Sequence, residues 1–274
     1  MADMTPEEEW RAMLTGTHPH LEHKPFRWVP SGPRCKLCAA PFGHPGATLF
    51  RRYGFSPWEK NPNICGRCFQ GLMDHVKSCP SSEEDGAVAG AEVEVSMLFA
   101  DVRGSSELAR RMPASEFARL MQRFYTRSRA ILIDGDAIVE KFIGDEVAGL
   151  FLPFMTGPDH AGRAVDVARE LLRATGHGSP DGPWIPLGVG VHTGTAFVGM
   201  VASGGASDFT ALGYPVNIAA HLAAQAGVGE ILVGDSAAAA ATLAGGAHER
   251  RHLSLKGHPF EAIALSIQAA PTAP

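Results

Sequence analysis

The sequence predicts an α+β fold for most of this 274-residue chain, preceded by a small module that contains all the cysteines. Strand and helix signals alternate from residue 92 onward in the order β-α-β-β-α-β, which is typical of ferredoxin-like sandwiches. The five cysteines lie between Cys35 and Cys79, so the two parts differ sharply in composition. Residues 81–91 are first polar and then small, which indicates a linker between the parts.

The predicted organisation is an N-terminal module over 1–80, the linker 81–91, a main domain over 92–268 and a frayed tail over 269–274. The net charge of −5 provides no strong overall basic field to hold nucleic acid. The N-terminus is acidic, and the longest dense apolar stretch, 147–155, is far shorter than the ~20 residues of a spanning helix. We therefore expect a soluble, cytoplasmic protein.

The first half of the main domain shows clear periodicity. Residues 92–101 begin with strict alternation of polar and apolar residues and end apolar, as a buried central strand does. Residues 115–132 space their apolar side chains at helical intervals. The apolar runs 137–143 and 146–152 flank a Gly-Asp pair, which predicts a hairpin with Asp145 near its tip.

The second half continues the alternation. The runs 187–191 and 196–201 predict a second hairpin that turns at residues 192–194. A strand is predicted over 230–233, and helices are predicted over 159–175, 216–226 and 236–243. The whole pattern predicts a mostly antiparallel sheet with helices packed on it.

Two aspartates stand where predicted strands end. Asp101 closes the first strand and Asp145 lies at the hairpin tip, so the carboxylates converge if these strands are neighbours in one sheet. Paired carboxylates on rigid strands suit Mg²⁺ or Mn²⁺, which prefer oxygen ligands and leave coordination sites open for phosphate. Taken singly, one aspartate is also typical of a strand-end cap and the other of a turn.

A phosphate-binding element is expected directly after the first strand. The sequence contains no Walker A loop, so the usual phosphate cradle is excluded. At Gly104, Ser105 and Ser106 a strand has ended and a helix begins, so free backbone N–H groups are available to donate to phosphate oxygens.

Five segments in order extend these local signals. Together they resemble the ordered motifs of the class III nucleotide cyclase catalytic domain, over roughly residues 92–268. The segments are 99–104, 139–146, 188–194, 211–220 and 255–257. Each one is weak alone, whereas five in this order and spacing are specific.

The resemblance implies a homodimer that pairs head to tail, with each active site built from both chains. Asp101 and Asp145 match the two metal aspartates, and the carbonyl of Val102 completes the shell of two Mg²⁺ or Mn²⁺ ions. The implied reaction is attack of the ribose 3′-hydroxyl of ATP on the α-phosphate. Its products are 3′,5′-cyclic AMP, an intracellular signal, and pyrophosphate.

The same resemblance implies the substrate contacts. Lys141 and Thr210 match the positions that recognise the purine and come from the partner chain. Asn217 matches the asparagine that orients the ribose and the transition state, and Lys256 matches a lysine that touches the terminal phosphates. Lysine donates to adenine N1 and threonine accepts from the 6-amino group, so this pair favours ATP over GTP.

Three residues depart from the family pattern. Thr210 stands where many adenylyl members carry aspartate, and Ser105 stands where the family usually carries phenylalanine. His221 occupies the position four after Asn217, where the family carries a transition-state arginine, and a neutral imidazole cannot make that bidentate phosphate contact. The alternatives are therefore a catalytically impaired regulatory or nucleotide-binding module and, further, a guanylate cyclase.

The cysteines form two pairs with metal-ligand spacing. Cys35 and Cys38 form one C-x₂-C pair, and Cys65 and Cys68 form the second. Four thiolates at this spacing suit a structural Zn²⁺ in tetrahedral coordination. The second pair opens an amphipathic run, which looks like the helix of a treble-clef finger. The alternative is an iron–sulfur cluster or a redox dithiol, with Cys79 as an extra ligand.

The cysteine module is expected to receive a sensory input or a protein partner. Residues 1–85 carry ten basic and ten acidic side chains, so this part of the chain is neutral. A neutral module lacks the phosphate-binding charge that nucleic acid requires, which argues against nucleic acid as its partner.

Overall fold

The computed structural model describes residues 4–22, 24–30, 32–44, 46–77, 89–203, 206–243, 245–246 and 248–266. The chain forms two compact units. Unit 1 comprises 1–93, 152–157 and 197–212, and unit 2 comprises 94–151, 158–196 and 213–274. Strands β1 (Ala89–Val102) and β4 (Leu187–Ser203) each contribute residues to both units.

Unit 2 follows the predicted order of helices and strands. After β1 come two helices, a hairpin, a further long helix and β4, which is the β-α-β-β-α-β arrangement. These elements are α5 (Ser105–Arg111), α6 (Ala114–Asp134), β2 (Ile138–Ile143), β3 (Glu146–Phe151) and α8 (His160–Ala174). The C-terminal part adds α9 (Tyr214–Gln225), β6 (Glu230–Gly234), α10 (Asp235–Ala240), β7 (Glu249–Leu255) and β8 (His258–Ser266).

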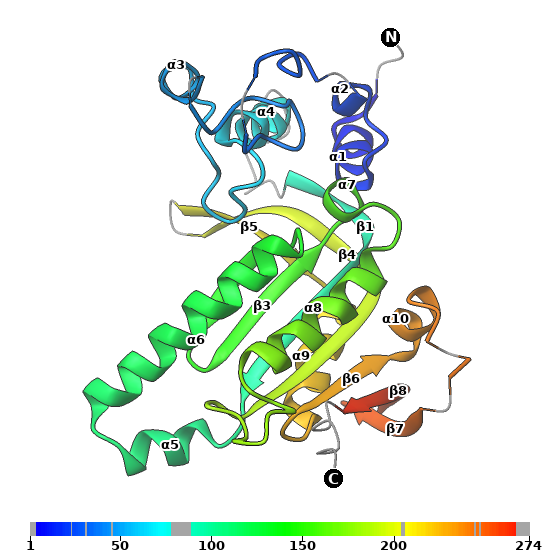
Figure 1. Ribbon diagram of the computed structural model, residues 1–274. Helices are drawn as coiled ribbons and strands as arrows, with labels where there is room; N and C mark the ends of the chain where they lie inside the picture. Colours follow the sequence, from blue (N-terminus) through cyan, green and yellow to red (C-terminus); the bar gives the residue numbers. More distant parts are fainter. Residues whose placement is uncertain are drawn as a thin grey trace. The chain divides into compact units, whose positions relative to one another are not determined.

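The strands of unit 2 form one mixed sheet in the order β2-β3-β1-β4-β6-β8-β7. β4 and β6 run parallel, whereas β1–β3, β2–β3, β6–β8 and β7–β8 are antiparallel pairs. α6 and α8 cover one face of this sheet and α9 covers the other (Figure 1). Along β6, Ile231 and Val233 join the core under α6 and α8, whereas Leu232 packs with Leu222 of α9. The mixed α+β fold is confirmed.

The second predicted hairpin is wrong. β4 runs without a turn through all of its 17 residues, pairing first with β6 and then with β5 (Ala206–Leu212). Gly194, which indicates a turn, and Gly190 instead let α9 approach the strand. A Cβ on Gly190 would lie 2.4 Å from the carbonyl oxygen of Ala219, and one on Gly194 would lie 2.8 Å from the ring of Pro215. These glycines therefore allow α9 to pack closely on β4 and do not form a turn.

The other predicted elements of unit 2 are present, with ends that differ by a few residues. Two strands of unit 2, β7 and β8, and β5 of unit 1 are not predicted individually. β7 alternates exposed and half-buried residues and begins with three charged side chains, Glu249, Arg250 and Arg251, so it has no apolar run to reveal it. Such a strand is stabilised by pairing with its neighbour in the sheet more than by its own pattern of apolar residues.

Unit 1 is built around the cysteines. It contains α1 (Pro6–Thr15), α2 (Pro19–Glu22), α3 (Ala47–Arg52), α4 (Gly66–Lys77), α7 (Pro153–Thr156) and β5. α4 confirms the helix predicted after the second cysteine pair. The buried core of unit 1 combines Cys35, Cys38 and Cys65 with apolar side chains, among them Phe42, Ile64 and Met155.

Several sequence predictions lie at the margins of the described ranges. Most of the predicted linker 81–91 and the whole tail 269–274 lie outside the described residues, as does Cys79, and the residues from 89 to 91 already belong to β1. The predicted domain boundary therefore stays a prediction. In the ranges that are described, no helix is both long enough and apolar enough to span a membrane.

Candidate active site and cysteine cluster

The two predicted metal aspartates lie at adjacent strand ends. Asp101, near the end of β1, is in register with Glu146, the first residue of β3. Asp145 directly precedes Glu146, and its main-chain carbonyl accepts a hydrogen bond from the N–H of Val102 at 3.1 Å. Gly144 has a φ of 60°, which permits the tight connection between β2 and β3. The sheet register therefore brings both aspartates to one edge.

Arg103 is a further charged residue at this edge, and no sequence pattern singles it out. It forms an ion pair with Asp101 and donates a hydrogen bond to the main-chain carbonyl of Ala224 on α9 at 2.7 Å. Burial lowers the pKa of Arg103, whereas the charges of Asp145 and Glu146 raise it. Arginine stays charged under such a shift because its ordinary pKa is above about 12. One cation of the chain is therefore already held against Asp101.

Negative charge is concentrated at the same edge. Burial raises the pKa of Glu146, and the charge of Asp145 raises it further. The pKa of Tyr125, whose hydroxyl donates to the carbonyl of Gly144, is raised for the same two reasons. A carboxylate whose negative charge raises the pKa of its neighbours is stabilised when a cation binds beside it. This edge of the sheet is therefore suited to binding a cation.

Ser105 contacts the second aspartate directly. Its Oγ donates a hydrogen bond to Oδ2 of Asp145, so the residue that replaces the expected phenylalanine orients a carboxylate. Gly104 has a φ of 68°, and its carbonyl accepts from the N–H of Leu108 at 3.0 Å as α5 begins. Ser106 is exposed on the first turn. The phosphate-binding role of this segment stays a prediction.

The helix α9 and the β7–β8 hairpin hold the next group of predicted residues. The ring of His221 lies 6.2 Å from that of Phe260 on β8, which sets the hairpin against the helix. Lys256 has a φ of 50° and forms the two-residue turn with Gly257, where it is exposed. Asn217 is exposed one turn before His221. Three predicted residues thus come from two elements in mutual contact.

The two predicted purine-recognising residues lie on different strands. Thr210 is on β5 in unit 1, in register with Gly199 of β4, and 5% of it is exposed. Lys141 is on β2 in unit 2, in register with Ala148 of β3 at an irregularity in the pairing. Its side chain lies outside the described part of the structure. The joint role of the pair stays a prediction.

The four paired cysteines converge in unit 1, with all sulfur atoms within 4.8 Å of one another. The Sγ atoms of Cys35 and Cys68 are 3.9 Å apart, and those of Cys38 and Cys65 are 3.7 Å apart. Zinc–thiolate bonds of about 2.3 Å in a tetrahedron place sulfurs about 3.8 Å apart, so the spacing fits a single ion. A cluster of several irons needs room for iron and sulfide between the thiols, which this spacing does not leave.

Backbone N–H groups at this cluster favour charged sulfur. The N–H of Cys65 donates to Sγ of Cys35 at 3.3 Å, and the N–H of Cys68 donates to Sγ of Cys65 at 3.3 Å. Hydrogen bonding with Cys38 lowers the pKa of Cys35, whereas hydrogen bonding with Cys35 raises the pKa of Cys68. Sulfurs this close cannot all ionise by themselves, so four thiolates need a bound cation. The donor set therefore fits Zn²⁺.

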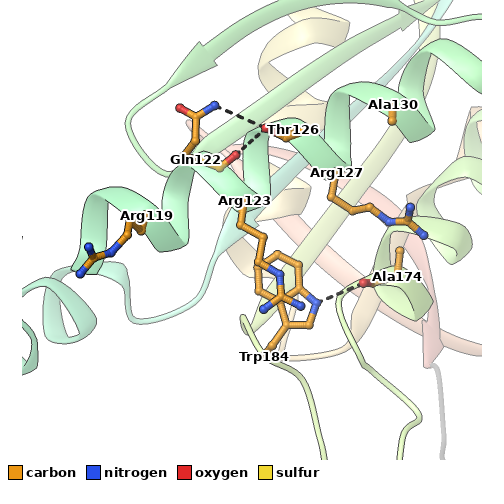
Figure 2. Close-up of a pocket in the computed structure, with 8 residues that line it drawn as sticks. All are labelled: Arg119, Gln122, Arg123, Thr126, Arg127, Ala130, Ala174 and Trp184. Carbon is orange, nitrogen blue, oxygen red and sulfur yellow. Dashed lines mark hydrogen bonds between the residues drawn. The ribbon is translucent and has the colours of Figure 1, made fainter. Parts of the chain in front are cut away.

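A separate groove on unit 2 runs along α6 (Figure 2). Its volume is about 690 Å³, and Arg119, Arg123 and Arg127 line it at every fourth position of the helix. The guanidinium of Arg123 lies 4.1 Å from the ring centre of Trp184, whose indole N–H donates to the carbonyl of Ala174 at 3.1 Å. None of the predicted site residues is among the described side chains that line it. The predicted active-site residues therefore lie outside this groove.

Comparison with known proteins extends these observations. The family model for the adenylate and guanylate cyclase catalytic domain matches residues 88–265, which is more than half of the chain. The uncharacterized protein Rv1318c of Mycobacterium tuberculosis is 28% identical over 190 residues, covering 65% of this chain and 33% of the relative. This chain therefore spans about a third of the length of that curated relative.

Solved structures share the fold. The guanylyl cyclase Cya2 has a TM-score of 0.56 at 20% identity, covering 66% of this chain and 95% of its own. The adenylyl cyclase CyaB from P. aeruginosa has a TM-score of 0.55 at 22% identity, covering 67% of this chain and 98% of its own. The family match spans both aspartates of the strand edge and α9. The chain belongs to the adenylate and guanylate cyclase catalytic domain family.

Proposed function

We propose that this protein is an adenylate cyclase that forms 3′,5′-cyclic AMP and pyrophosphate from ATP at a homodimer interface. The observation that carries the proposal is the strand register that sets Asp101 and Asp145 at one edge of a cyclase-family domain. Paired carboxylates of this kind support metal-assisted chemistry on phosphate. Lys141 and Thr210 support ATP over GTP, since a lysine donates to adenine N1 and cannot accept from guanine.

The strand edge fits Mg²⁺ or Mn²⁺. These ions prefer oxygen ligands, and Asp101, Asp145 and the carbonyl of Val102 would hold them. Bound there, they would lower the pKa of the ribose 3′-hydroxyl and neutralise charge on the phosphates. Ser105 orients Asp145 through its hydrogen bond, and Arg103 would give up its ion pair with Asp101 if the ions bound there.

The chain's own side chains would position ATP. Lys141 and Thr210 would recognise adenine in the site whose aspartates belong to the partner chain. Asn217, exposed on α9, would orient the ribose, and Lys256 would meet the terminal phosphates from the hairpin turn. Backbone N–H groups at 104–106 would donate to phosphate oxygens at the start of α5.

A second candidate function is a catalytically impaired regulatory or nucleotide-binding module, and His221 is the observation that favours it. This histidine stands one turn after Asn217, at the position where the family carries the transition-state arginine. Loss of one such contact to the developing charge costs about 10²–10³-fold in rate. A guanylate cyclase is the third candidate, and Lys141 argues against it.

Turnover of ATP and of GTP with Mn²⁺ separates these candidates. We expect slow formation of cyclic AMP, a preference for ATP, and a rate increase of about 10²-fold in His221→Arg. His252→Arg is the matched control because it adds an arginine at an exposed histidine of β7. If wild type and His221→Arg both form neither cyclic nucleotide, the cyclase proposal fails and the regulatory module stands.

Mixing of variants tests the shared active site. Asp101→Ala and Asn217→Ala chains are each expected to be inactive alone and to regain activity when mixed. Recovery is expected if each site takes its aspartates from one chain and Asn217 from the other, because one of the two sites in the mixed dimer then keeps every residue. No recovery, with dimers present by light scattering, would contradict a site built from both chains.

We also propose that Cys35, Cys38, Cys65 and Cys68 hold one structural Zn²⁺ ion, which would stabilise a module whose own core is small. Purified protein is expected to contain about one zinc per chain and to show no visible absorption from iron. Iron with a sulfide-dependent chromophore would instead support a cluster.

A further inference from the structure

The cysteine module contacts the strand that carries Thr210. β5 and residues 58–69 belong to the same compact unit. The Nζ of Lys60 donates to the main-chain carbonyl of Phe209 at 2.9 Å and also forms an ion pair with Asp208. Phe209 directly precedes Thr210, so the lysine binds the backbone next to the predicted adenine-recognising residue. Lys60 thereby joins segments that are 149 positions apart in the sequence.

Two aromatic rings of the module pack on the same phenylalanine. Trp58 and Phe69 stack with ring centres 3.9 Å apart and planes 17° apart. Phe209 meets both rings edge-on, at 6.1 Å and 5.8 Å, and is 2% exposed. Side chains alternate along a strand, so Phe209 and Thr210 face opposite sides of β5 and share its backbone. A shift of Phe209 is therefore a shift of Thr210.

The same residues connect to the cysteine cluster. Phe69 directly follows one cysteine of the cluster on α4. The N–H of Trp58 donates at 2.8 Å to the carbonyl of Ile64, which directly precedes Cys65. Pro57 forms a β-bridge with Cys65. An ion held by the four sulfurs would therefore fix the loop that carries both the tryptophan and the lysine.

We infer that Lys60 and the Trp58–Phe69 ring pair are positioning residues for Thr210, so that metal binding at the cysteines controls discrimination between ATP and GTP. The inference rests on the proposed recognition of adenine by Thr210. Lys60 acts through the backbone of β5 and does not touch the substrate. When the cluster loses its ion, the loop is released and β5 loses two anchors, the ammonium group and the packed rings.

Lys60→Gln tests the connection between the cysteine cluster and β5. It removes the ammonium group that binds the backbone of β5 and leaves the four cysteines and the ring pair in place. We expect the ratio of kcat/KM for ATP over GTP to fall about three- to tenfold, which corresponds to the loss of one typical hydrogen bond. Amide hydrogen exchange across 208–212 is expected to quicken about tenfold, with unchanged zinc content. Lys24→Gln is the control, because it removes an exposed lysine of the same unit, and it leaves both readouts unchanged.

Removal of the metal from the cysteine cluster provides a second test of the inference. Removal of zinc by a chelator, with Mn²⁺ restored before the assay, is expected to produce the same two changes in wild type. The further change in Lys60→Gln is expected to be smaller, because the variant has already lost the ammonium anchor and has only the packed rings left to lose. Phe69→Leu is an independent way to remove an anchor without removing a sulfur. An active enzyme whose base preference and exchange are unchanged in both variants overturns the inference. Inactivity on both nucleotides overturns the proposed function instead, while hydrogen exchange still decides whether Lys60 anchors β5.

Discussion

The two candidate metal sites of this chain are built in opposite ways. The cysteine site takes its ligands from one local stretch, with Cys35 and Cys68 only 33 positions apart, and its sulfurs already stand at tetrahedral spacing. The acidic site joins the ends of separate strands, and Arg103 is paired with Asp101 there. A closed set of thiolates suits an ion that holds structure, whereas an open carboxylate edge suits ions that meet an incoming substrate.

This difference predicts that a substitution that destroys one site leaves the other site intact. Loss of a carboxylate is expected to abolish the proposed cyclase activity and to leave the cysteine module folded, because the residues that hold each site lie in different compact units. Loss of a cysteine is expected to remove the proposed zinc ion, which would stabilise the small core of unit 1, and to affect the cyclase reaction only indirectly.

Asp101→Asn is expected to have the largest effect. An amide is a weaker ligand for Mg²⁺ or Mn²⁺ than a carboxylate, so cyclic AMP formation with Mn²⁺ is expected to fall at least about 10³-fold. Zinc content, measured by elemental analysis, is expected to stay unchanged. Asp181→Asn, which changes an exposed aspartate, is the control and keeps full activity. Zinc loss in Asp101→Asn would show that the two sites depend on each other.

Cys65→Ser is the reciprocal change. A four-ligand site that loses one thiolate is expected to bind zinc on the order of 10²-fold more weakly or worse. Hydrogen exchange in α4 should quicken, since this helix begins directly after Cys65. Cys79→Ser is the matched control and is expected to keep zinc. Loss of metal in both variants would contradict a site made of the two C-x₂-C pairs alone.

The parts of the fold that could be predicted are those with a local cause. The alternation of strands and helices follows from side-chain periodicity, and the hairpin at Asp145 follows from short apolar runs around a turn glycine. The false hairpin at residues 192–194 shows the limit of such reasoning. Gly194 resembles a turn residue, but its small size, like that of Gly190, is required by α9, which packs on β4 from a distant part of the sequence.

The site residues that sequence reasoning missed act through distant partners. Arg103 binds the carbonyl of Ala224, 121 positions away, and Lys60 binds that of Phe209, 149 positions away. No local period or spacing encodes such contacts. Ser105 did leave a signal, because it replaces the expected phenylalanine, but its hydrogen bond to Asp145 becomes visible only once the strands are paired.

Three buried histidines are expected to make the stability of unit 2 depend on pH. Burial lowers the pKa of His192 to about 4, with Asp235 opposing the shift, and burial also lowers the pKa of His160 and His177. Between the ordinary value of 6.5 and about 4, the unfolded chain binds protons that the folded chain does not. The free energy of unfolding is therefore expected to fall as pH drops through this window, by on the order of 3 kcal/mol for His192.

Denaturant unfolding at several pH values between 7 and 4 measures this loss. His192→Gln, which cannot gain a proton there, is expected to flatten the dependence, and the difference between the two proteins cancels any release of metal from the thiolates. His252→Gln changes an exposed histidine and should keep the wild-type slope. Equal slopes in wild type and His192→Gln would mean that His192 is not held neutral in the folded chain.

Arg103→Gln is expected to have the smallest effect, and it tests why the acidic site differs from the cysteine site. The guanidinium neutralises Asp101 and repels incoming cations, so its removal is expected to lower the Mn²⁺ concentration for half-maximal activity about three- to tenfold. Glutamine still offers an N–H to the carbonyl of Ala224, and Arg110→Gln removes an exposed arginine of α5 as the control. A higher Mn²⁺ requirement in Arg103→Gln would mean instead that the arginine holds Asp101 in place for the metal. The chelator sensitivity of zinc should be the same in both variants, because Arg103 and Arg110 lie in unit 2 and the four cysteines lie in unit 1.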